Sequence, residues 1–294
     1  RFEVGIEHIS GLVEKLVLLH YSRGVNYRHE KNLSAAQRDV SLAEYYVEML
    51  HGGIQDDLGH FNEALNHYQK ALIFAEKSNQ LRQVGRVQYS MGIVLAKLEQ
   101  FEEAFDHFRA AIDLFVTIKN KIQEMFARSN YGSTLALAGN YQAGINESLK
   151  ALAFYEKTRS AYWIALNATT LADTYFDMGN LEEAAHYARK VIEQEEMQFY
   201  PYGLYTMGAV RQAQDDLKVA KDLFAQAAQM AENNEDRYMQ AYAQRALGEV
   251  CCQLGDMASG EQSLQQAYRL FGKMGIGSEI KKTESLMERY SSTA

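Results

Sequence analysis

A repeat with a period of about 40 residues constrains this chain more than any other feature of its sequence. Each copy has a small residue, usually Gly seven positions later, then Ala, an aromatic or small residue, and Ala again. The leading small residues are Gly52, Gly92, Gly132, Ala172, Gly208 and Gly248. Their spacing is constant except for one shorter step, from Ala172 to Gly208. This regularity predicts a repeat protein in which one structural unit is used six times.

Each copy is predicted to contain two helices joined by a short turn. In the second copy these helices are expected near residues 83–98 and 101–118, and the second has apolar residues three and four apart, such as Phe101, Phe105 and Phe108. That spacing places them on one face of a helix. Small residues such as Gly92 and Ala104 would let the two helices cross closely. The single proline among 294 residues also favours helices, because turn-rich β folds use proline more often.

Taken together, the small residue at the helix crossing, the Gly at the turn and the Ala-x-x-x-aromatic-x-x-Ala spacing resemble the tetratricopeptide repeat over residues 45–274. The resemblance implies an all-α fold, a right-handed α-solenoid of six helix-turn-helix repeats. Residues 1–44 are expected to form N-terminal helices that make a degenerate repeat or cap, and residues 275–294 a C-terminal capping helix and tail. We expect one continuous domain, cut from a larger protein because the chain begins with Arg rather than Met.

The two ends of the array depart from the repeat pattern. Gly24, Ala36 and Ala43 mimic it, but Gly24 precedes Gly52 by much less than one full period. This copy is therefore either degenerate, or its second helix is fused with the helix that follows. At the other end, Ser278 is expected to cap a closing helix over residues 278–290.

The period is longer than the roughly 34 residues of the tetratricopeptide family, which usually has a proline just after the second helix. The corresponding positions here are Glu76, Val116, Glu156, Glu196, Glu232 and Gly272. Without proline the second helix can continue, so we expect it to contain all of the extra length. The only proline, Pro201, lies where the spacing of the repeats is shortest. There Phe199, Tyr200 and Pro201 are expected to end one helix, begin the next and act as a hinge.

Charge and composition exclude several classes of function. A net charge of −8 without a basic cluster argues against direct nucleic-acid binding. No apolar run is long enough to span a membrane, and the N-terminus lacks the order of a signal peptide. Cys251 and Cys252 are adjacent, so they cannot join distant segments and are expected to pack in the core. We therefore expect a cytoplasmic protein with no membrane partner.

Motifs for catalysis and for cofactor binding are missing from the sequence. It contains no phosphate-binding loop, nucleophile elbow, zinc-protease pair or dinucleotide fingerprint. Asp56, Asp57, His60 and His67 fall within one helical hairpin, but solvated surface explains them better than a metal site does. The sequence thus predicts a protein that is not an enzyme and has no cofactor and no metal site.

The inner face of the array is the remaining candidate for function. In proteins that resemble this family the first helices line a concave groove, which here implies a partner-binding set with many aromatic residues. That set is Tyr46, Arg86, Tyr89, Phe126, Ser129, Asn130, Thr169, Asp173, Tyr202, Tyr205, Gln212, Tyr242, Arg245 and Glu249. Asn130 stands where the family often places an amide that binds a peptide backbone. Tyrosine and arginine anchor interfaces well, although any one tyrosine could instead pack between adjacent repeats.

The resulting hypothesis is a non-catalytic module that binds a protein or peptide segment in the groove and relays its presence to other domains of a parent chain. Long repeats poor in proline are similar to the sensor arrays of bacterial regulators, including STAND-type ATPases such as the maltose-regulon activator and Rap-type peptide receptors. Two alternatives stay open at this point. One is a structural scaffold or self-association module that uses the outer surface, and the other is a small-molecule sensor. The sequence does not specify the oligomeric state.

Overall fold

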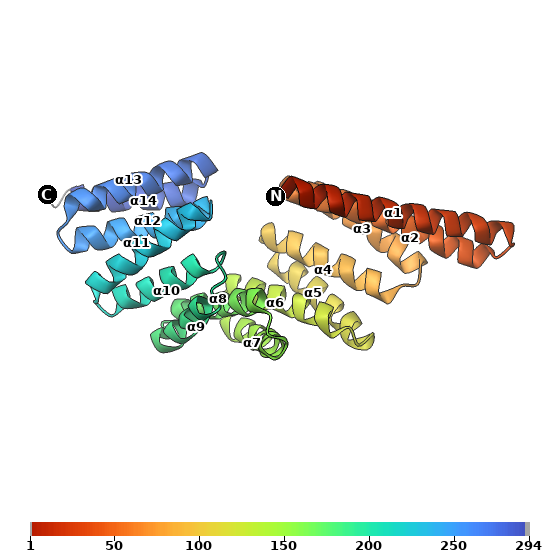
Figure 1. The fold of residues 1–294 in the computed structure, drawn as a ribbon, viewed down its shortest axis with the longest axis horizontal. Coiled ribbons are helices and arrows are strands. Elements are labelled where there is room, and N and C mark those ends of the chain that lie inside the picture. Colours follow the sequence, from red (N-terminus) through yellow and green to blue (C-terminus); the bar gives the residue numbers. More distant parts are fainter. Residues whose placement is uncertain (1, 292–294) are drawn as a thin grey trace. The chain divides into compact units, whose positions relative to one another are not determined.

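The computed structural model describes the backbone of residues 2–291 and the side chains of residues 14–290. Within the described residues the chain forms fourteen α-helices and no strand (Figure 1). The helices are α1 (Phe2–His29), α2 (Leu33–Asp57), α3 (Phe61–Lys77), α4 (Leu81–Lys97), α5 (Phe101–Thr117), α6 (Lys121–Leu137), α7 (Tyr141–Thr158), α8 (Ala161–Asp177), α9 (Leu181–Glu193), α10 (Tyr200–Ala213), α11 (Leu217–Asn233), α12 (Arg237–Gln253), α13 (Met257–Met274) and α14 (Gly277–Ser291). The predicted all-α solenoid of helix-turn-helix repeats is confirmed.

The chain divides into two compact units, Arg1–Glu147 and Ser148–Ala294, and the division falls inside α7. In each unit the first helix of a repeat packs against the second helix of the same repeat, as α4 does against α5 and α12 against α13 (Figure 1). The second helix then packs against the first helix of the next repeat, as α11 does against α12. The organisation as one continuous domain stays a prediction.

The long period arises from two helices of equal length. In the second repeat α4 and α5 each have 17 residues, and three residues connect each helix to the next. A repeat of about 34 residues with the same connections would leave about 14 residues for each helix. The extra residues are therefore shared by both helices, and the expectation that the second helix alone contains them is wrong. Both helices can lengthen because proline is missing from the last turns of both.

A residue with a positive, left-handed φ angle follows nearly every helix and helps to set the repeat period. Positive φ angles recur at every half period from Gly59 to Gly179 and again from Glu195 to Gly275. Glycine occupies the turn inside a repeat at Gly59, as predicted, with φ of 78°, whereas Glu99 adopts φ of 59° in the equivalent turn of the next repeat. A side chain in this conformation costs roughly 1–2 kcal/mol, so these turns hold the helix ends at an energetic cost where glycine is missing.

The shortened repeat results from the loss of one helical turn in α9. This helix has 13 residues, whereas the equivalent helix α5 has 17 residues. Pro201 lies in the first turn of α10 and helps to begin that helix, as predicted. However, α9 already ends at Glu193, so the expectation that this segment also stops the preceding helix is wrong. The left-handed backbone of Glu195 ends α9 instead, as at the other helix ends.

Glycine permits the close crossing of the two helices within a repeat. A Cβ atom on Gly52 would lie 2.5 Å from the ring of Tyr68, and one on Gly208 would lie 2.8 Å from the ring of Phe224. Tyr68 and Phe224 are the aromatic residues of the repeat pattern in their copies, and both are buried. In these copies the repeat pattern therefore pairs a glycine with a large side chain on the facing helix.

The N-terminal repeat shares a helix with the next one. α2 is continuous over 25 residues and contains Ala36, Ala43 and also Gly52. Gly24 on α1 packs against Val40 and the backbone of Ala36. Of the two alternatives for this end, the fused helix is the one observed.

The C-terminal helix α14 packs against α13. It begins at Gly277, so Ser278 lies inside the helix and the expectation that Ser278 is the cap is wrong. Gly275 with φ of 71° ends α13 and places the start of α14 one residue earlier than the serine alone suggests. Ile280 packs against the cluster around Phe271, while Glu279 is buried on the same helix.

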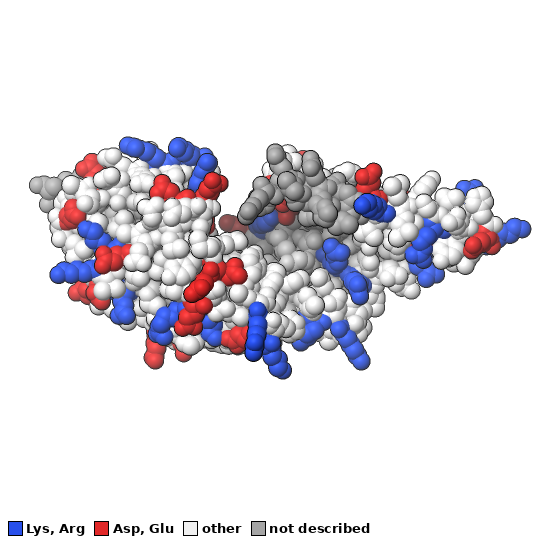
Figure 2. Space-filling model, in the orientation of Figure 1, with Lys and Arg blue, Asp and Glu red and all other residues white. Residues whose placement is uncertain are grey.

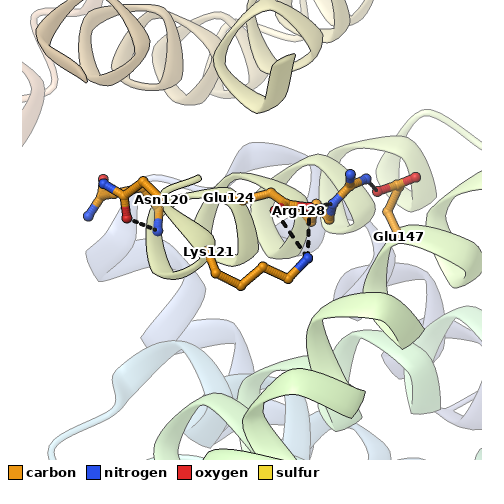
Figure 3. Close-up of polar contacts among 6 residues, drawn as sticks. Asn120, Lys121, Glu124, Arg128 and Glu147 are labelled. Atoms are coloured by element: carbon orange, nitrogen blue, oxygen red, sulfur yellow. Dashed lines mark hydrogen bonds and ion pairs between the residues drawn. The ribbon is translucent and has the colours of Figure 1, made fainter. Parts of the chain in front are cut away.

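A chain of charged side chains joins α6 to α7 (Figure 3). The buried Glu124 accepts hydrogen bonds from Lys121 and Arg128, at 3.1 and 2.9 Å. Arg128 also donates to Glu147 on α7 at 2.5 Å. At the start of α6, Asn120 caps the helix by accepting a hydrogen bond from the backbone of Gln123. These bonds fix the N-terminal half of α6, next to the predicted groove residues 126–130.

Candidate functional site

The first helices of the second unit line a pocket of about 280 Å³. The lining residues come from α8, α10 and α12 and are Asp173, Phe176, Asp177, Tyr202, Tyr205, Thr206, Ala209, Tyr238, Met239 and Tyr242. Four of them, Asp173, Tyr202, Tyr205 and Tyr242, belong to the predicted partner-binding set. Their convergence follows from the repeat, because equivalent faces of α8, α10 and α12 point to one side of the stack.

Asp173 is the central acidic group of this pocket. Its Oδ1 accepts a hydrogen bond of 2.8 Å from Thr206 on α10. Its side chain is accessible from the pocket, yet protein surrounds it closely enough that burial raises its pKa to about 6. The nearby Asp177 contributes to this rise, and burial also raises the pKa of Asp177. The pocket thus concentrates negative charge in a partly desolvated place.

Tyrosine rings form the other walls and are held by contacts with neighbouring helices. The Tyr202 hydroxyl donates to Asp236 at 2.9 Å, and Asp236 in turn caps α12. The rings of Tyr238 and Tyr242 lie 4.7 Å apart, and their hydroxyls are hydrogen-bonded at 3.2 Å. Tyr205 packs against Phe224 with 5.5 Å between ring centroids. These contacts therefore hold the tyrosine side chains in place, and the same side chains line the pocket.

Burial also raises the pKa of the tyrosine hydroxyls. For Tyr205 the value rises to about 12. The hydroxyls of Tyr202 and Tyr242 shift in the same direction, first because of burial and then because of hydrogen bonds with Asp236 and Tyr238. These side chains therefore stay neutral and present ring faces and hydroxyl groups to a ligand.

Arg245, another predicted binding residue, is engaged by the C-terminal helix. Its guanidinium lies 5.0 Å from the ring centroid of Tyr242 and 5.3 Å from that of Phe271, and it pairs with Glu279. Burial alone would raise the pKa of Glu279, but hydrogen bonds from Lys282 and Arg245 lower it overall. The arrangement connects α12 to α14, so Arg245 supports the wall of the pocket at Tyr242 and has its charge already matched.

The remaining predicted residues of the second unit lie outside the pocket lining. Thr169 donates to the backbone carbonyl of Ala165 at 3.0 Å. Gln212 donates to Gln253 at 3.2 Å, and Glu249 pairs with Arg289 at 3.9 Å. Their role in binding a partner stays a prediction.

In the first unit the structure brings Tyr89 and Asn130 together. The Asn130 amide nitrogen donates to the Tyr89 hydroxyl at 2.9 Å and to the Phe126 carbonyl at 3.1 Å. Both amide hydrogens are thus used within the protein. A peptide backbone could bind the amide oxygen of Asn130, or it would have to replace Tyr89 as the acceptor.

The other predicted residues of the first unit lie in different environments. The Tyr46 ring stacks on His20 at 5.8 Å and contacts the buried Tyr45. Arg86 is exposed and Phe126 is half-buried. Ser129 is buried, and its hydroxyl has no hydrogen-bond partner in the described structure.

The predicted partner-binding set leaves out six residues that line the pocket. They are Phe176, Asp177, Thr206, Ala209, Tyr238 and Met239. Two of them had a usable signal, because Asp177 and Tyr238 stand four positions from Asp173 and Tyr242 and so share a helix face with them. Cys251 and Cys252 are buried and unpaired, as expected.

On the visible face of the second unit, acidic and basic side chains are interspersed (Figure 2). None of the described helices has the length and apolar character needed to cross a membrane.

Comparison with known proteins supports the repeat assignment. Residues 168–196, which span the end of α8 and all of α9, match the tetratricopeptide repeat model. No curated protein matches the chain. Among solved structures, similarity extends over nearly the whole chain at 11–15% identity.

Three of these structures illustrate the similarity. A Rap protein in complex with competence and sporulation factor is 15% identical and has a TM-score of 0.61, covering 99% of this chain and 93% of its own. Aspartyl phosphate phosphatase F from Bacillus subtilis is 15% identical, with a TM-score of 0.64 and coverage of 95% and 79%. The apo quorum sensor NprR from B. thuringiensis is 11% identical, with a TM-score of 0.61 and coverage of 97% and 91%. The predicted resemblance is confirmed: residues 168–196 match the tetratricopeptide repeat, and the chain has the helical-repeat fold of these Rap-like proteins.

Proposed function

We propose that the chain is a peptide-binding regulatory module and that the pocket between α8, α10 and α12 anchors a cationic side chain of the bound segment. One observation supports this most directly. The described lining of the pocket contains two carboxylates and four tyrosine rings, but no lysine or arginine. Carboxylates attract a cation, and the faces of aromatic rings add a further favourable interaction with it.

The size of the pocket fits one side chain rather than a whole ligand. Its volume of about 280 Å³ lies just below the range of roughly 300–1,000 Å³ typical of small-molecule sites. A lysine or arginine side chain could enter with its charged group at Asp173 and its methylene groups against Tyr205 and Tyr242. The rest of the segment would then lie along the exposed faces of the first helices.

The charge of Asp173 links this binding to pH. A bound cation favours the ionised carboxylate, whereas burial raises its pKa to about 6 in the free protein. Affinity is therefore expected to increase as the pH rises through about 6 and Asp173 becomes ionised. A neutral asparagine in its place would remove most of this dependence.

On a larger scale, we propose that the array is a cytoplasmic sensor or regulatory region of a bacterial signalling or transcription-regulatory protein. The similarity to a Rap protein bound to competence and sporulation factor and to a quorum sensor supports this role. A solenoid suits it, because a small change at each junction adds up along the stack. Phe199, Tyr200 and Pro201 are the proposed hinge. We propose no catalytic activity, although one structure with this fold is a phosphatase.

The experiment that tests the binding role is a selection of displayed, short randomised peptides on the immobilised chain. We expect enriched peptides to share a lysine or arginine at one position. The enrichment should disappear when Asp173→Asn and Asp177→Asn are combined, and it should persist with Asp222→Asn, an exposed change on α11. Enriched peptides without a shared cation would contradict the anchoring role, and no enrichment at all would contradict peptide binding.

A second candidate function is docking of a partner on the second helices. A separate, largely apolar pocket of about 480 Å³ lies between α9, α10 and α11 and is lined by residues that include Leu181, Met207 and Leu223. It favours the scaffold alternative, in which the outer surface binds a partner. Replacement of Leu223 by Glu would abolish capture of such a partner and leave peptide selection by the α8, α10 and α12 pocket unchanged.

A further inference from the structure

A cluster of three metal-ligating side chains lies in the first unit, far along the sequence from the proposed peptide pocket. Glu48 and His51 are one turn apart on α2, and His67 lies on the facing helix α3. Each offers one ligand atom, and the three atoms lie within 4.8 Å of one another. The sequence prediction grouped His67 with Asp56, Asp57 and His60, and it did not include Glu48 or His51.

The local contacts show that the three side chains face one another. His67 Nδ1 is 2.7 Å from a carboxylate oxygen of Glu48. The rings of His51 and His67 are 5.2 Å apart and inclined at 47°. Glu48 and His67 are half-buried, whereas His51 is exposed. One side of the cluster is thus formed by protein and the other is open to solvent.

The backbones that present these side chains are held close together. Gly52 follows His51, and Tyr68 follows His67, and these two neighbours make the tight crossing of α2 and α3. Because the crossing fixes the separation of the two helices at this level, side-chain rotation alone is needed to adjust the three ligand atoms. A preformed backbone lowers the cost of assembling a site.

The donor set indicates the class of metal. Two imidazole nitrogens and one carboxylate oxygen suit zinc and similar divalent transition metals, while magnesium and calcium prefer oxygen ligands alone. Tetrahedral zinc with bonds of about 2.0 Å needs ligand atoms roughly 3.3 Å apart. The ligand atoms are now at most 4.8 Å apart, and His67 Nδ1 lies 2.7 Å from Glu48. Rotation of the side chains can bring these distances to the required value.

We propose that Glu48, His51 and His67 bind one zinc-class divalent metal ion between α2 and α3, with water at the open position. The ion would join the two helices of the first repeat. Binding to the folded chain would then stabilise this unit by an amount that increases with the logarithm of the metal concentration above the dissociation constant. Binding should weaken as the pH falls, because metal ligands must be deprotonated.

Isothermal titration of zinc chloride into the untagged, metal-stripped full chain tests the proposal. We expect one ion per chain, no binding of magnesium chloride, and a rise in the midpoint of thermal unfolding with zinc. His51→Gln and His67→Gln should each weaken zinc binding at least tenfold. His51 is exposed, so His51→Gln keeps the fold, which circular dichroism without metal verifies.

Matched controls separate this cluster from other ligands. His60→Gln removes a histidine of the same hairpin that is hydrogen-bonded to Gln55 at 2.8 Å, and it should leave the affinity unchanged. A combined Cys251→Ser and Cys252→Ser variant should also bind zinc like the wild type. Absence of zinc binding, or binding that His51→Gln and His67→Gln leave intact, would overturn the proposal.

Discussion

Adjacent glycines in α2 allow a sharp test of how the helices of a repeat pack. A Cβ atom added to Gly52 would lie 2.5 and 2.7 Å from two ring carbons of Tyr68, whereas one added to Gly53 would meet nothing within 4 Å. Both glycines lie inside the same helix. Alanine should therefore give the same gain in helix propensity at both positions, about 1 kcal/mol, and only Gly52→Ala should introduce a clash.

The cost of that clash depends on whether the Tyr68 ring can move. Tyr68 is only 5% exposed, and its hydroxyl interacts with the side chain of Ser90. Overpacking in such a place costs about 1–3 kcal/mol. We expect Gly53→Ala to raise the free energy of unfolding by up to about 1 kcal/mol. The free energy of unfolding of Gly52→Ala should be about 1–3 kcal/mol lower than that of Gly53→Ala.

Urea unfolding followed by circular dichroism measures both variants, with a chelator present so that metal binding at the neighbouring His51 plays no part. Tyr68→Leu removes the ring carbons that the new Cβ would meet. In that background, Gly52→Ala should lose most of its penalty relative to Gly53→Ala. Equal stability of the two single variants would refute the view that these glycines are there to admit the facing ring.

Further predictions concern turns, a buried ion pair, pH and the proposed hinge. Glu99→Gly should raise the free energy of unfolding by about 0.5–1 kcal/mol, measured in urea, because the residue has φ of 59°. Arg245→Met should lower it by about 2 kcal/mol because Glu279 loses the guanidinium and keeps only Lys282 as a partner, and adding Glu279→Leu should recover most of the loss; no recovery would argue against the pair. Asp173 binds a proton more tightly in the folded chain than in the unfolded chain, so its contribution to stability should decrease as the pH rises from about 4 to about 6 and then stay constant. Asp173→Asn should remove that decrease in urea midpoints taken across this range. Hydrogen exchange at Phe199 should be faster than in the middle of α10; equal protection would count against a hinge there.

The sequence was sufficient to predict the fold because its signals are periodic. The leading small residues and the alanines on the second helices follow one repeat. Each departure from that repeat corresponds to a structural feature. The shortened spacing before Gly208 corresponds to the lost turn of α9, and the early Gly24 to the fused helix α2. Equal lengthening of both helices was not predictable from the missing proline, since that absence permits extension without saying which helix extends.

Site residues were predictable only as far as they follow the repeat. Tyr202, Tyr205 and Tyr242 line the pocket because their position in the repeat places them on the first helices. The engagement of Arg245 by Glu279 depends on where α14 docks, which no periodic signal records. The cluster of Glu48, His51 and His67 likewise depends on side chains from two helices meeting at one level of the crossing.

The most direct test of the account is a double-mutant cycle between the pocket and its ligand. Two peptides are titrated into the wild-type chain and into Asp173→Asn. One is a selected peptide with an anchoring arginine, and the other has citrulline in place of that arginine. Citrulline keeps the shape of arginine and removes its charge. We predict that the wild type binds the arginine peptide at least tenfold more tightly than the citrulline peptide, and that Asp173→Asn abolishes most of this preference. This corresponds to a coupling free energy of about 1.4 kcal/mol or more. An equal preference for arginine in both proteins would contradict the central claim that Asp173 anchors a cationic side chain.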